Sequence, residues 1–291
     1  MTQLSTVFSR LTSGVPTFIR SLFKKTFFTG ALFSLMFLLS SHELFLKSDT
    51  YFLHQGEPSE IYLFNGTFDN SENAITTNRI TGARILGTNF DFLPKDSDYF
   101  IRDKITYLKF TPGEPGTYAA GISTLPNMIE LGPKDFKEYL EHEGLEKMIA
   151  ERKEKGVEDQ SVREKYSKHV KAILQVGGAR TEHFSEEFGY PIEFIPVNNP
   201  YELKVGDKAT FKLLLNGKPL SGQGVHISSR NDGVNPFAKE IPSTTDAKGQ
   251  VSFEINETGH WYVATIHMVE SPEEDVDYES NWATITFEVG E

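Results

Sequence analysis

The chain has 291 residues, 38% of them apolar, and its 41 acidic residues outnumber 29 basic ones to give a net charge of −12 at pH 7. This acidic balance argues against binding to nucleic acid or to anionic lipid, because both carry negative charge. Cysteine is absent, which excludes disulfide bonds and thiolate metal sites and leaves burial of a hydrophobic core to stabilise the fold.

Residues 1–41 have the composition of an export signal. Four basic residues and no acid precede or border the apolar stretch 27–41, which ends in Ser40 and Ser41. A basic start, a short apolar core and small residues at the end are typical of a secretory signal, and the core is shorter than the roughly 20 residues of a membrane span. We expect cleavage near Ser41 and a periplasmic or cell-envelope location. An uncleaved anchor formed by residues 27–41 stays open, since Leu39 departs from the usual small residue.

Residues 42–130 are predicted to form a first β-sandwich domain. Short β-rich runs are separated by turn sequences such as Asn65-Gly66 and residues 111–116. Tyr107, Lys109 and Thr111 alternate with the apolar residues Leu108 and Phe110, which is the period-two pattern of a strand with one buried face. Several strands at this spacing favour a sandwich.

Residues 131–180 are predicted to be a helical insertion. Apolar residues repeat with a helical period from Phe136, and Pro133 suits a first helical turn. A second helix is predicted over residues 161–174, because Ser161 and Glu164 have the spacing of a capping box and Gly177 follows the segment.

Residues 181–291 return to strand patterns and are predicted to be a second β-sandwich domain, of immunoglobulin-like or transthyretin-like type. Asn216-Gly217 is a hairpin signal, and residues 246–249 form a tight turn into a strand. The predicted fold class is therefore mostly β, with two β-sandwich domains and a helical segment between them.

A series of short motifs recurs in order along nearly all of the chain after residue 41. They are His42-Glu-Leu-Phe-Leu46, then Phe136, Tyr139, Leu140, Gly144 and Leu145, and the segments 163–167, 196–201, 217–220, 245–249, 259–261, 266–268 and 279–287. Together they resemble one family of exported bacterial proteins, domain-of-unknown-function family 4198, which is associated with nickel and cobalt uptake. The family pattern has Phe-Trp where this chain has Leu44 and Phe45. The resemblance implies a periplasmic protein whose partner is a membrane metal transporter.

The residues themselves favour a metal site built from imidazole and carboxylate. Cleavage after Ser41 would make His42 the first residue, and its α-amine and ring nitrogen together chelate transition metals such as nickel, cobalt, copper or zinc. His267 lies in a predicted strand and is followed by an acidic loop that ends at Glu279. We expect His42, His267 and Glu279 to be ligands of one ion. The alternative is that His267 is a strand histidine with an ordinary hydrogen bond and that the loop is solvated.

The other histidines carry weaker signals. We expect His54 and His142 to face solvent, and His226 lies in a predicted strand. No histidine pair has the spacing of a helical metal site, and the usual nucleophile, phosphate-loop and zinc-protease motifs are absent. The sequence therefore predicts a non-enzymatic protein. The alternative to metal binding is an envelope interaction module that binds a protein or a glycan; the sequence leaves the oligomeric state open.

Overall fold

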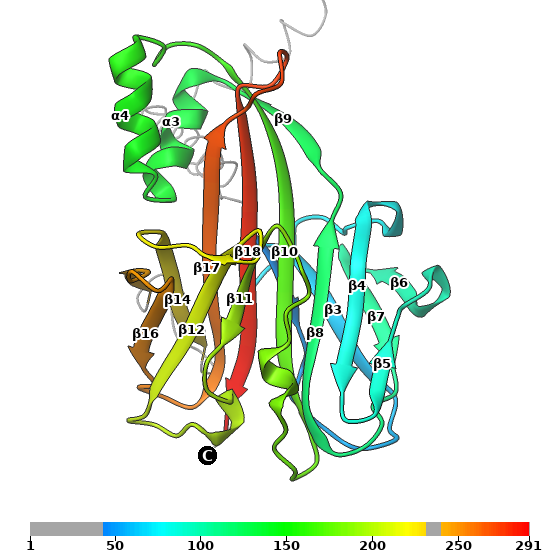
Figure 1. The fold of residues 1–291 in the computed structure, drawn as a ribbon. Coiled ribbons are helices and arrows are strands. Elements are labelled where there is room, and N and C mark those ends of the chain that lie inside the picture. Colours follow the sequence, from blue (N-terminus) through cyan, green and yellow to red (C-terminus); the bar gives the residue numbers. More distant parts are fainter. Residues whose placement is uncertain (1–42, 231–239, 291) are drawn as a thin grey trace, which may run out of the picture. The chain divides into compact units, whose positions relative to one another are not determined.

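The computed structural model describes residues 43–230 and 240–290, so the predicted export segment and His42 lie outside the described residues. The described residues belong to one compact unit. The described part is mostly β, as predicted, with three sheets and two α-helices (Figure 1). Within it, no helix is long and apolar enough to cross a membrane.

The first sheet has four strands in the order β1-β3-β7-β6. Its strands are antiparallel: β1 (Glu43–Lys47), β3 (Ser59–Gly66), β7 (Ile105–Phe110) and β6 (Tyr99–Arg102). The predicted alternation in β7 is confirmed, because Thr106, Leu108 and Phe110 are buried while Lys109 is exposed.

The largest sheet has ten strands, and its main order is β15-β14-β17-β18-β10-β8-β4-β5. The strands on this path are β15 (Ile241–Thr244), β14 (Gly224–Arg230), β17 (Gly259–Glu270), β18 (Tyr278–Val289), β10 (Val162–Val176), β8 (Gly116–Thr124), β4 (Ile80–Gly87) and β5 (Phe90–Phe92). Two further strands, β2 (Phe52–Leu53) and β9 (Asn127–Leu131), also pair with β10. The sheet thus takes strands from both of the sequence ranges predicted as sandwich domains.

The third sheet has the order β11-β12-β13, and β16 also pairs with β12. Its strands are β11 (Ile192–Pro196), β12 (Lys208–Leu215), β13 (Lys218–Pro219) and β16 (Gln250–Glu254). Short 3-10 turns at Thr77–Arg79, Asp96–Asp98, Glu182–Ser185 and Pro200–Glu202 lie in the connections.

The large sheet is covered on both faces. Ile285 and Phe287 of β18 belong to the main core with Phe211 of β12, and the rings of Phe211 and Phe287 are 5.4 Å apart. On the opposite face, Thr284 and Thr286 of β18 point at β1: their hydroxyls donate to the carbonyl oxygens of Leu44 (2.7 Å) and Leu46. Strand β1, close to the start of the chain, is thereby fixed across the strand nearest to its end.

Helices α3 (Pro133–His142) and α4 (Glu146–Lys155) form a hairpin beside β17 and β18 (Figure 1). Pro133 begins α3, as predicted. The hairpin packs through Phe136, Leu140 and Met148 on a small core that is separate from the main one.

The predicted second helix over residues 161–174 is wrong, because residues 162–174 belong to the long strand β10. This strand lies inside the sheet, paired in parallel with β18 and antiparallel with β8 and β9. Lys168 and Lys171 give the segment the look of a polar helix face, but both are buried. Lys171 Nζ lies 3.0 Å from Glu193 Oε2 of β11. The charge of Lys171 is therefore balanced by a buried carboxylate, whereas the sequence pattern had suggested that this lysine faces solvent.

The two threonines of β18 allow a direct test of how β1 is held. Thr284→Val or Thr286→Val keeps the side-chain shape but leaves a buried carbonyl of β1 without its donor. We expect each change to lower the free energy of unfolding by about 1–3 kcal/mol, measured by urea denaturation. The control is Thr210→Val on β12, whose hydroxyl pairs with Ser252 at a solvent-accessible position. A cost no larger than that of the control would contradict this role of β18.

Candidate functional site

The start of β1 lies against two distant parts of the chain. Glu43 begins β1, opposite Gly66 of β3, and is half-buried. Its carboxylate interacts electrostatically with His142 and Glu143 at the end of α3, with His226 of β14, and with Glu240, the residue before β15. We name this group of five residues the acid–imidazole cluster; it consists of Glu43, His142, Glu143, His226 and Glu240.

Two imidazole–carboxylate contacts belong to the cluster. His142 Nδ1 lies 3.0 Å from Glu143 Oε1 at the end of α3. His226 Nδ1 on β14 lies 3.3 Å from Glu240 Oε1. The Glu143 side chain is only 4% exposed, whereas that of its partner His142 is 59% exposed. The deeply buried carboxylate of Glu143 is thus in contact with an imidazole.

Burial and crowding of carboxylates change the protonation of the cluster. The pKa of Glu43 is raised to about 8, first by burial and then by the negative charge of Glu143, with Glu240 acting in the same direction. Among the described residues no hydrogen bond to the Glu43 carboxylate is found. The hydrogen bond to Glu240 raises the pKa of His226 to about 9, and Glu143 raises that of His142 in the same way. In turn, His226 lowers the pKa of Glu240.

A buried lysine borders the cluster on β10. Lys168 Nζ donates to Asn65 Oδ1 at 3.0 Å and lies over the Trp282 ring. Burial lowers the pKa of Lys168 to about 8, and the negative charge of Glu43 opposes this shift. His226 and Lys168, two of the cationic groups that act on Glu43, therefore lose their charge at mildly alkaline pH.

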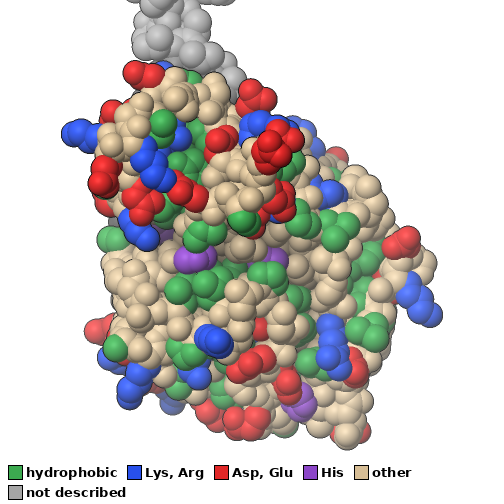
Figure 2. Space-filling model, turned by 45° about the horizontal axis from the view of Figure 1, so that its top comes forward, with side chains coloured by type: hydrophobic (Ala, Val, Ile, Leu, Met, Phe, Trp, Pro, Cys, Tyr) green, Lys and Arg blue, Asp and Glu red, His purple; other side chains and the backbone are tan. Residues whose placement is uncertain are grey.

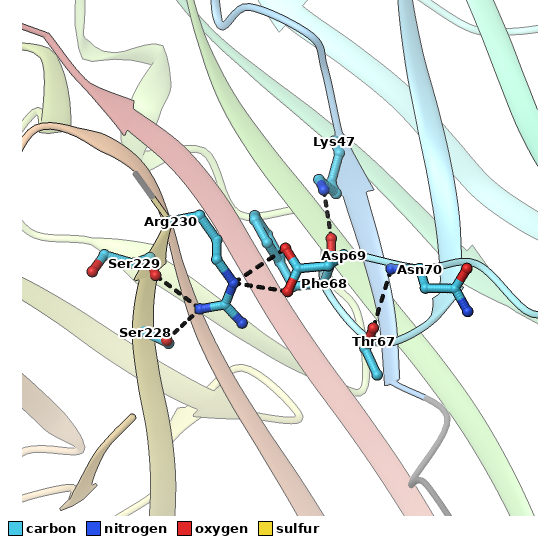
Figure 3. Close-up of polar contacts among 8 residues, drawn as sticks. All are labelled: Lys47, Thr67, Phe68, Asp69, Asn70, Ser228, Ser229 and Arg230. Atoms are coloured by element: carbon cyan, nitrogen blue, oxygen red, sulfur yellow. Dashed lines mark hydrogen bonds and ion pairs between the residues drawn. The ribbon is translucent and has the colours of Figure 1, made fainter. Parts of the chain in front are cut away.

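A second set of contacts joins β1 to β14 farther along both strands (Figure 3). Lys47 Nζ donates to the carbonyl oxygen of Phe68 at 2.5 Å, and Arg230 Nε lies 3.0 Å from an Asp69 carboxylate oxygen. Both cations lie over the Phe68 ring. Arg230 also donates to Ser228 Oγ at 2.7 Å.

Lys47 follows Glu43 by four residues, and Arg230 follows His226 by four. The loop of residues 67–70 after β3, named here the Phe68 loop, therefore fixes the relative position of β1 and β14, and with it the position of Glu43 relative to His226.

The chemistry of this cluster suits a cation. Carboxylate oxygen and imidazole nitrogen bind zinc, nickel, cobalt and copper(II), and no thiolate is available in this chain. In the described residues, no three His, Asp or Glu side chains already stand at ligand positions around one point. The cluster thus has suitable donors that would have to converge by side-chain rotation or be completed by a further ligand.

In the structure, the two described residues that the sequence predicts as metal ligands, His267 and Glu279, contact other side chains. His42 lies outside the described residues. His267 is on β17, where its Nδ1 lies 3.1 Å from Gln223 Oε1, and burial lowers its pKa. Glu279 is on the neighbouring strand β18, opposite Val269. Lys165 Nζ is 2.9 Å from Glu279 Oε1 and lowers the pKa of that carboxyl. Ligation of one ion by His42, His267 and Glu279 stays a prediction.

His267 also lines a cleft of about 560 Å³ between β17 and helix α4. The helical wall is formed by residues from Gly144 to Lys155, and the opposite wall by 222–224 and 266–270. In Figure 2, charged side chains gather on the upper part of the molecule, and histidine side chains are visible in a hollow just below them. The turn after α3 therefore has the cleft on one side and contributes His142 and Glu143 to the cluster.

The residues that the sequence analysis missed had faint signals. Glu43 adjoins His42 in the motif on which the resemblance rests, but carboxylates beside histidines are common. His142 was expected to face solvent, and it does so in part. His226 is 183 residues away from Glu43 in the sequence. Their proximity follows only from the sheet order β14-β17-β18 and from the packing of β1 on β18.

Comparisons with known proteins identify a family and no activity. A family model described as "Domain of unknown function (DUF4198)" matches residues 39–269. No curated protein matches the chain.

Solved structures give only distant likenesses. The D0-D1 domain of intimin is 10% identical with a TM-score of 0.19, and the match covers 84% of this chain and 97% of that one. Escherichia coli alpha-2-macroglobulin activated by porcine elastase is 12% identical with a TM-score of 0.21, covering 84% of this chain and 20% of that one. Salmonella alpha-2-macroglobulin reacted with methylamine is 10% identical with a TM-score of 0.21, covering 84% and 15%. At such TM-scores these structures support no conclusion about function.

The raised pKa of Glu43 predicts a pH-dependent effect of its removal. The pKa is 4.5 for an ordinary glutamate and about 8 here, so the folded protein holds a proton that the unfolded chain releases between these values. The stability that this proton contributes is complete below the lower value and is lost as the pH rises through the higher one.

In metal-free buffer, Glu43→Gln is therefore expected to raise the free energy of unfolding by about 2 kcal/mol at pH 9 and to change it little at pH 5. Urea denaturation at both pH values measures this difference, with exposed Glu57→Gln as the control. An equal effect of Glu43→Gln at pH 5 and pH 9 would show that its carboxylate is not in a charge-crowded site.

Proposed function

Because this chain belongs to the DUF4198 family, whose description assigns no activity, we propose a function from its own acid–imidazole cluster. The protein binds a divalent transition-metal ion, of the class of nickel, cobalt, zinc and copper, and supports its uptake without catalysing a reaction. The ion is its cargo. The protein works outside the cytoplasm, in the periplasm or at the cell envelope, and delivers the ion to a membrane metal transporter.

The observation that carries this proposal is the electrostatic state of Glu43. Its carboxylate lies with those of Glu143 and Glu240 in a partly buried place, and the opposing charges come from His142 and His226. Such an arrangement is costly without a cation, because like charges at low dielectric repel strongly. A divalent ion would replace the protons that Glu43 and the imidazoles hold, so the donor set fits a metal better than it fits an empty polar surface.

Four side chains would hold the ion, and the first residue of the processed chain would add further donor atoms. Glu43, Glu143, His142 and His226 supply two oxygen and two nitrogen donors. His42 is bonded to Glu43, and consecutive Cα atoms are about 3.8 Å apart, so cleavage at Ser41 would give the site an α-amine and a third imidazole. The family resemblance favours nickel and cobalt, and the donor types alone favour none of the four metals.

The proposal predicts which substitutions weaken binding. Isothermal titration of the protein without residues 1–41, with Ni²⁺, Co²⁺, Zn²⁺ and Cu²⁺ in turn, is expected to show one tight site. Glu43→Gln and His226→Gln each remove one donor and should weaken binding at least about tenfold. Binding should also weaken as the pH falls below about 9, because protons compete with the metal for His226, whose pKa is about 9, and for Glu43, whose pKa is about 8. The control is His54→Gln, at an exposed position beside a turn.

A further variant separates the cluster from the ligand set predicted from the sequence. His267→Ala should leave the affinity unchanged if the cluster holds the ion, and should reduce it as strongly as His226→Gln if His267 is a ligand. Failure of all four metals to bind would contradict the proposal. It would favour the other interpretation, an envelope module that binds a protein or a glycan.

A further inference from the structure

Strand β17 is longer than its neighbour β14, and this leaves part of one edge of β17 unpaired. Strand β18 pairs with β17 along its whole length, from Gly259 to Glu270. Strand β14 pairs only with residues 260–264 of β17. In the part of the chain that the structure describes, β14 and β18 are the only strands that pair with β17. The edge of residues 267–270 that faces away from β18 therefore has no strand beside it (Figure 1).

The backbone groups of this edge are available for pairing. In an antiparallel pair, the N–H and C=O groups of successive residues point alternately to the two sides of a strand. The carbonyl oxygen of Ile266 accepts from Gln223 Nε2 at 2.8 Å, on the β14 side of β17. The N–H and C=O groups of Met268 and Glu270 therefore point to that side, whereas those of His267 point to β18.

The cleft of about 560 Å³ lies along the same edge. Residues 266–270 of β17 line one wall, residues 222–224 at the start of β14 close one end, and α4 forms the opposite wall. The cleft thus occupies the place that β14 would fill if it were as long as β17. A strand added there would place alternate side chains against Leu145 and Met148, which line the helical wall. The volume is in the range of ligand-binding pockets.

The charges around the cleft favour a basic occupant. Lys147 lies 3.5 Å from Glu151, and Lys155 pairs with Glu270, so both lysines of the lining are already neutralised. Glu146 also lines the cleft and is exposed, and among the described residues it has no ion pair. The whole chain has a net charge of −12. An acidic surface of this kind attracts a partner segment that carries positive charge.

The ion pair between Lys155 and Glu270 does not block the cleft. Its two side chains are 50% and 49% exposed. An exposed ion pair of this kind contributes at most about 1 kcal/mol, so an incoming strand can displace it. A basic residue of that strand can then replace Lys155 beside Glu270.

We propose that the unpaired edge of β17 binds an extended basic segment of a partner protein, which adds to the sheet as a strand in the cleft between β17 and α4. Main-chain hydrogen bonds to Met268 and Glu270 hold the segment, its apolar side chains contact Leu145 and Met148, and its basic side chains neutralise Glu146. This binding is independent of the metal ion and goes beyond the proposed function.

Fluorescence anisotropy on the exported protein tests this inference, with a short labelled peptide in which valine and lysine alternate as the probe. We expect the peptide to bind with a Kd below about 1 mM. The same peptide with methylated backbone nitrogens cannot donate main-chain hydrogen bonds and should bind at least about tenfold more weakly. A peptide in which valine and glutamate alternate should also bind at least about tenfold more weakly, because it is repelled by the acidic lining.

Amide hydrogen exchange read by NMR locates the bound peptide. Exchange at the amides of Met268 and Glu270 should slow at least about fivefold when the peptide saturates the protein, because their N–H groups gain acceptors. The amide of His267 should be protected with and without the peptide, because it is already bonded to β18.

Matched variants separate the backbone from the charge. Glu270→Pro removes one N–H group from the free edge and should weaken binding at least about fivefold more than Glu270→Gln, which keeps that group. Glu146→Lys should weaken binding of the valine–lysine peptide at least about threefold. The control Glu57→Lys makes the same charge change at an exposed position outside the cleft and should leave binding unchanged. Urea denaturation checks that each variant is folded.

Three outcomes would overturn the inference. The first is that the valine–lysine peptide does not bind, and the second is that its methylated form binds equally well. The third is that a bound peptide leaves exchange at Met268 and Glu270 unchanged. Sedimentation that shows a dimer of the wild type and a monomer of Glu270→Pro would assign the edge to a second copy of this chain, and would also overturn it. Metal binding measured by calorimetry is a separate result that decides only the proposed function.

Discussion

The structure depends on how β1 is held across β18. Two buried hydroxyls, those of Thr284 and Thr286, donate to backbone carbonyls of Leu44 and Leu46, and Glu288 accepts from the backbone N–H of Tyr51 farther along. These contacts satisfy polar groups that would otherwise be buried without partners, so they fix both the position and the direction of β1. Leu44 and Leu46 are then part of the main core. The same placement of β1 puts Glu43 where it interacts electrostatically with the end of α3 and with His226.

The acid–imidazole cluster follows from this constraint and is unfavourable by itself. A half-buried carboxylate beside two others raises the free energy of the folded protein, and the imidazoles offset this only while they are protonated. Ionisable groups that are held close together at a cost in stability are typical of ligand-binding sites. Apolar residues would stabilise the fold better if the role of these positions were only structural. The Phe68 loop, with Lys47 and Arg230 on its ring, keeps β1 and β14 from separating under this repulsion.

Local patterns were sufficient for several strands and for the start of the first helix. Alternation identified β7, and Pro133 marked the start of α3. The segment 161–174 failed because lysines are counted as solvent-facing, whereas Lys168 and Lys171 are buried against Asn65 and Glu193. The sequence placed His267 in a strand correctly but could not supply its partner, Gln223. The cluster lay beyond sequence reasoning, since its members come from positions 43, 142, 143, 226 and 240. The packing of β1 on β18 brings these distant positions into one region.

The central claim is that Glu43 and His226 hold one metal ion. Anomalous diffraction from crystals of the processed protein grown with Co²⁺ or Zn²⁺ tests it most directly, because the ion is located without reference to any substitution. The account predicts a single strong peak about 2 Å from a Glu43 oxygen and a His226 nitrogen, with Glu143 also in contact. A strongest peak beside His267 and Glu279, or no peak near Glu43 at a metal concentration that saturates the protein in solution, would contradict it.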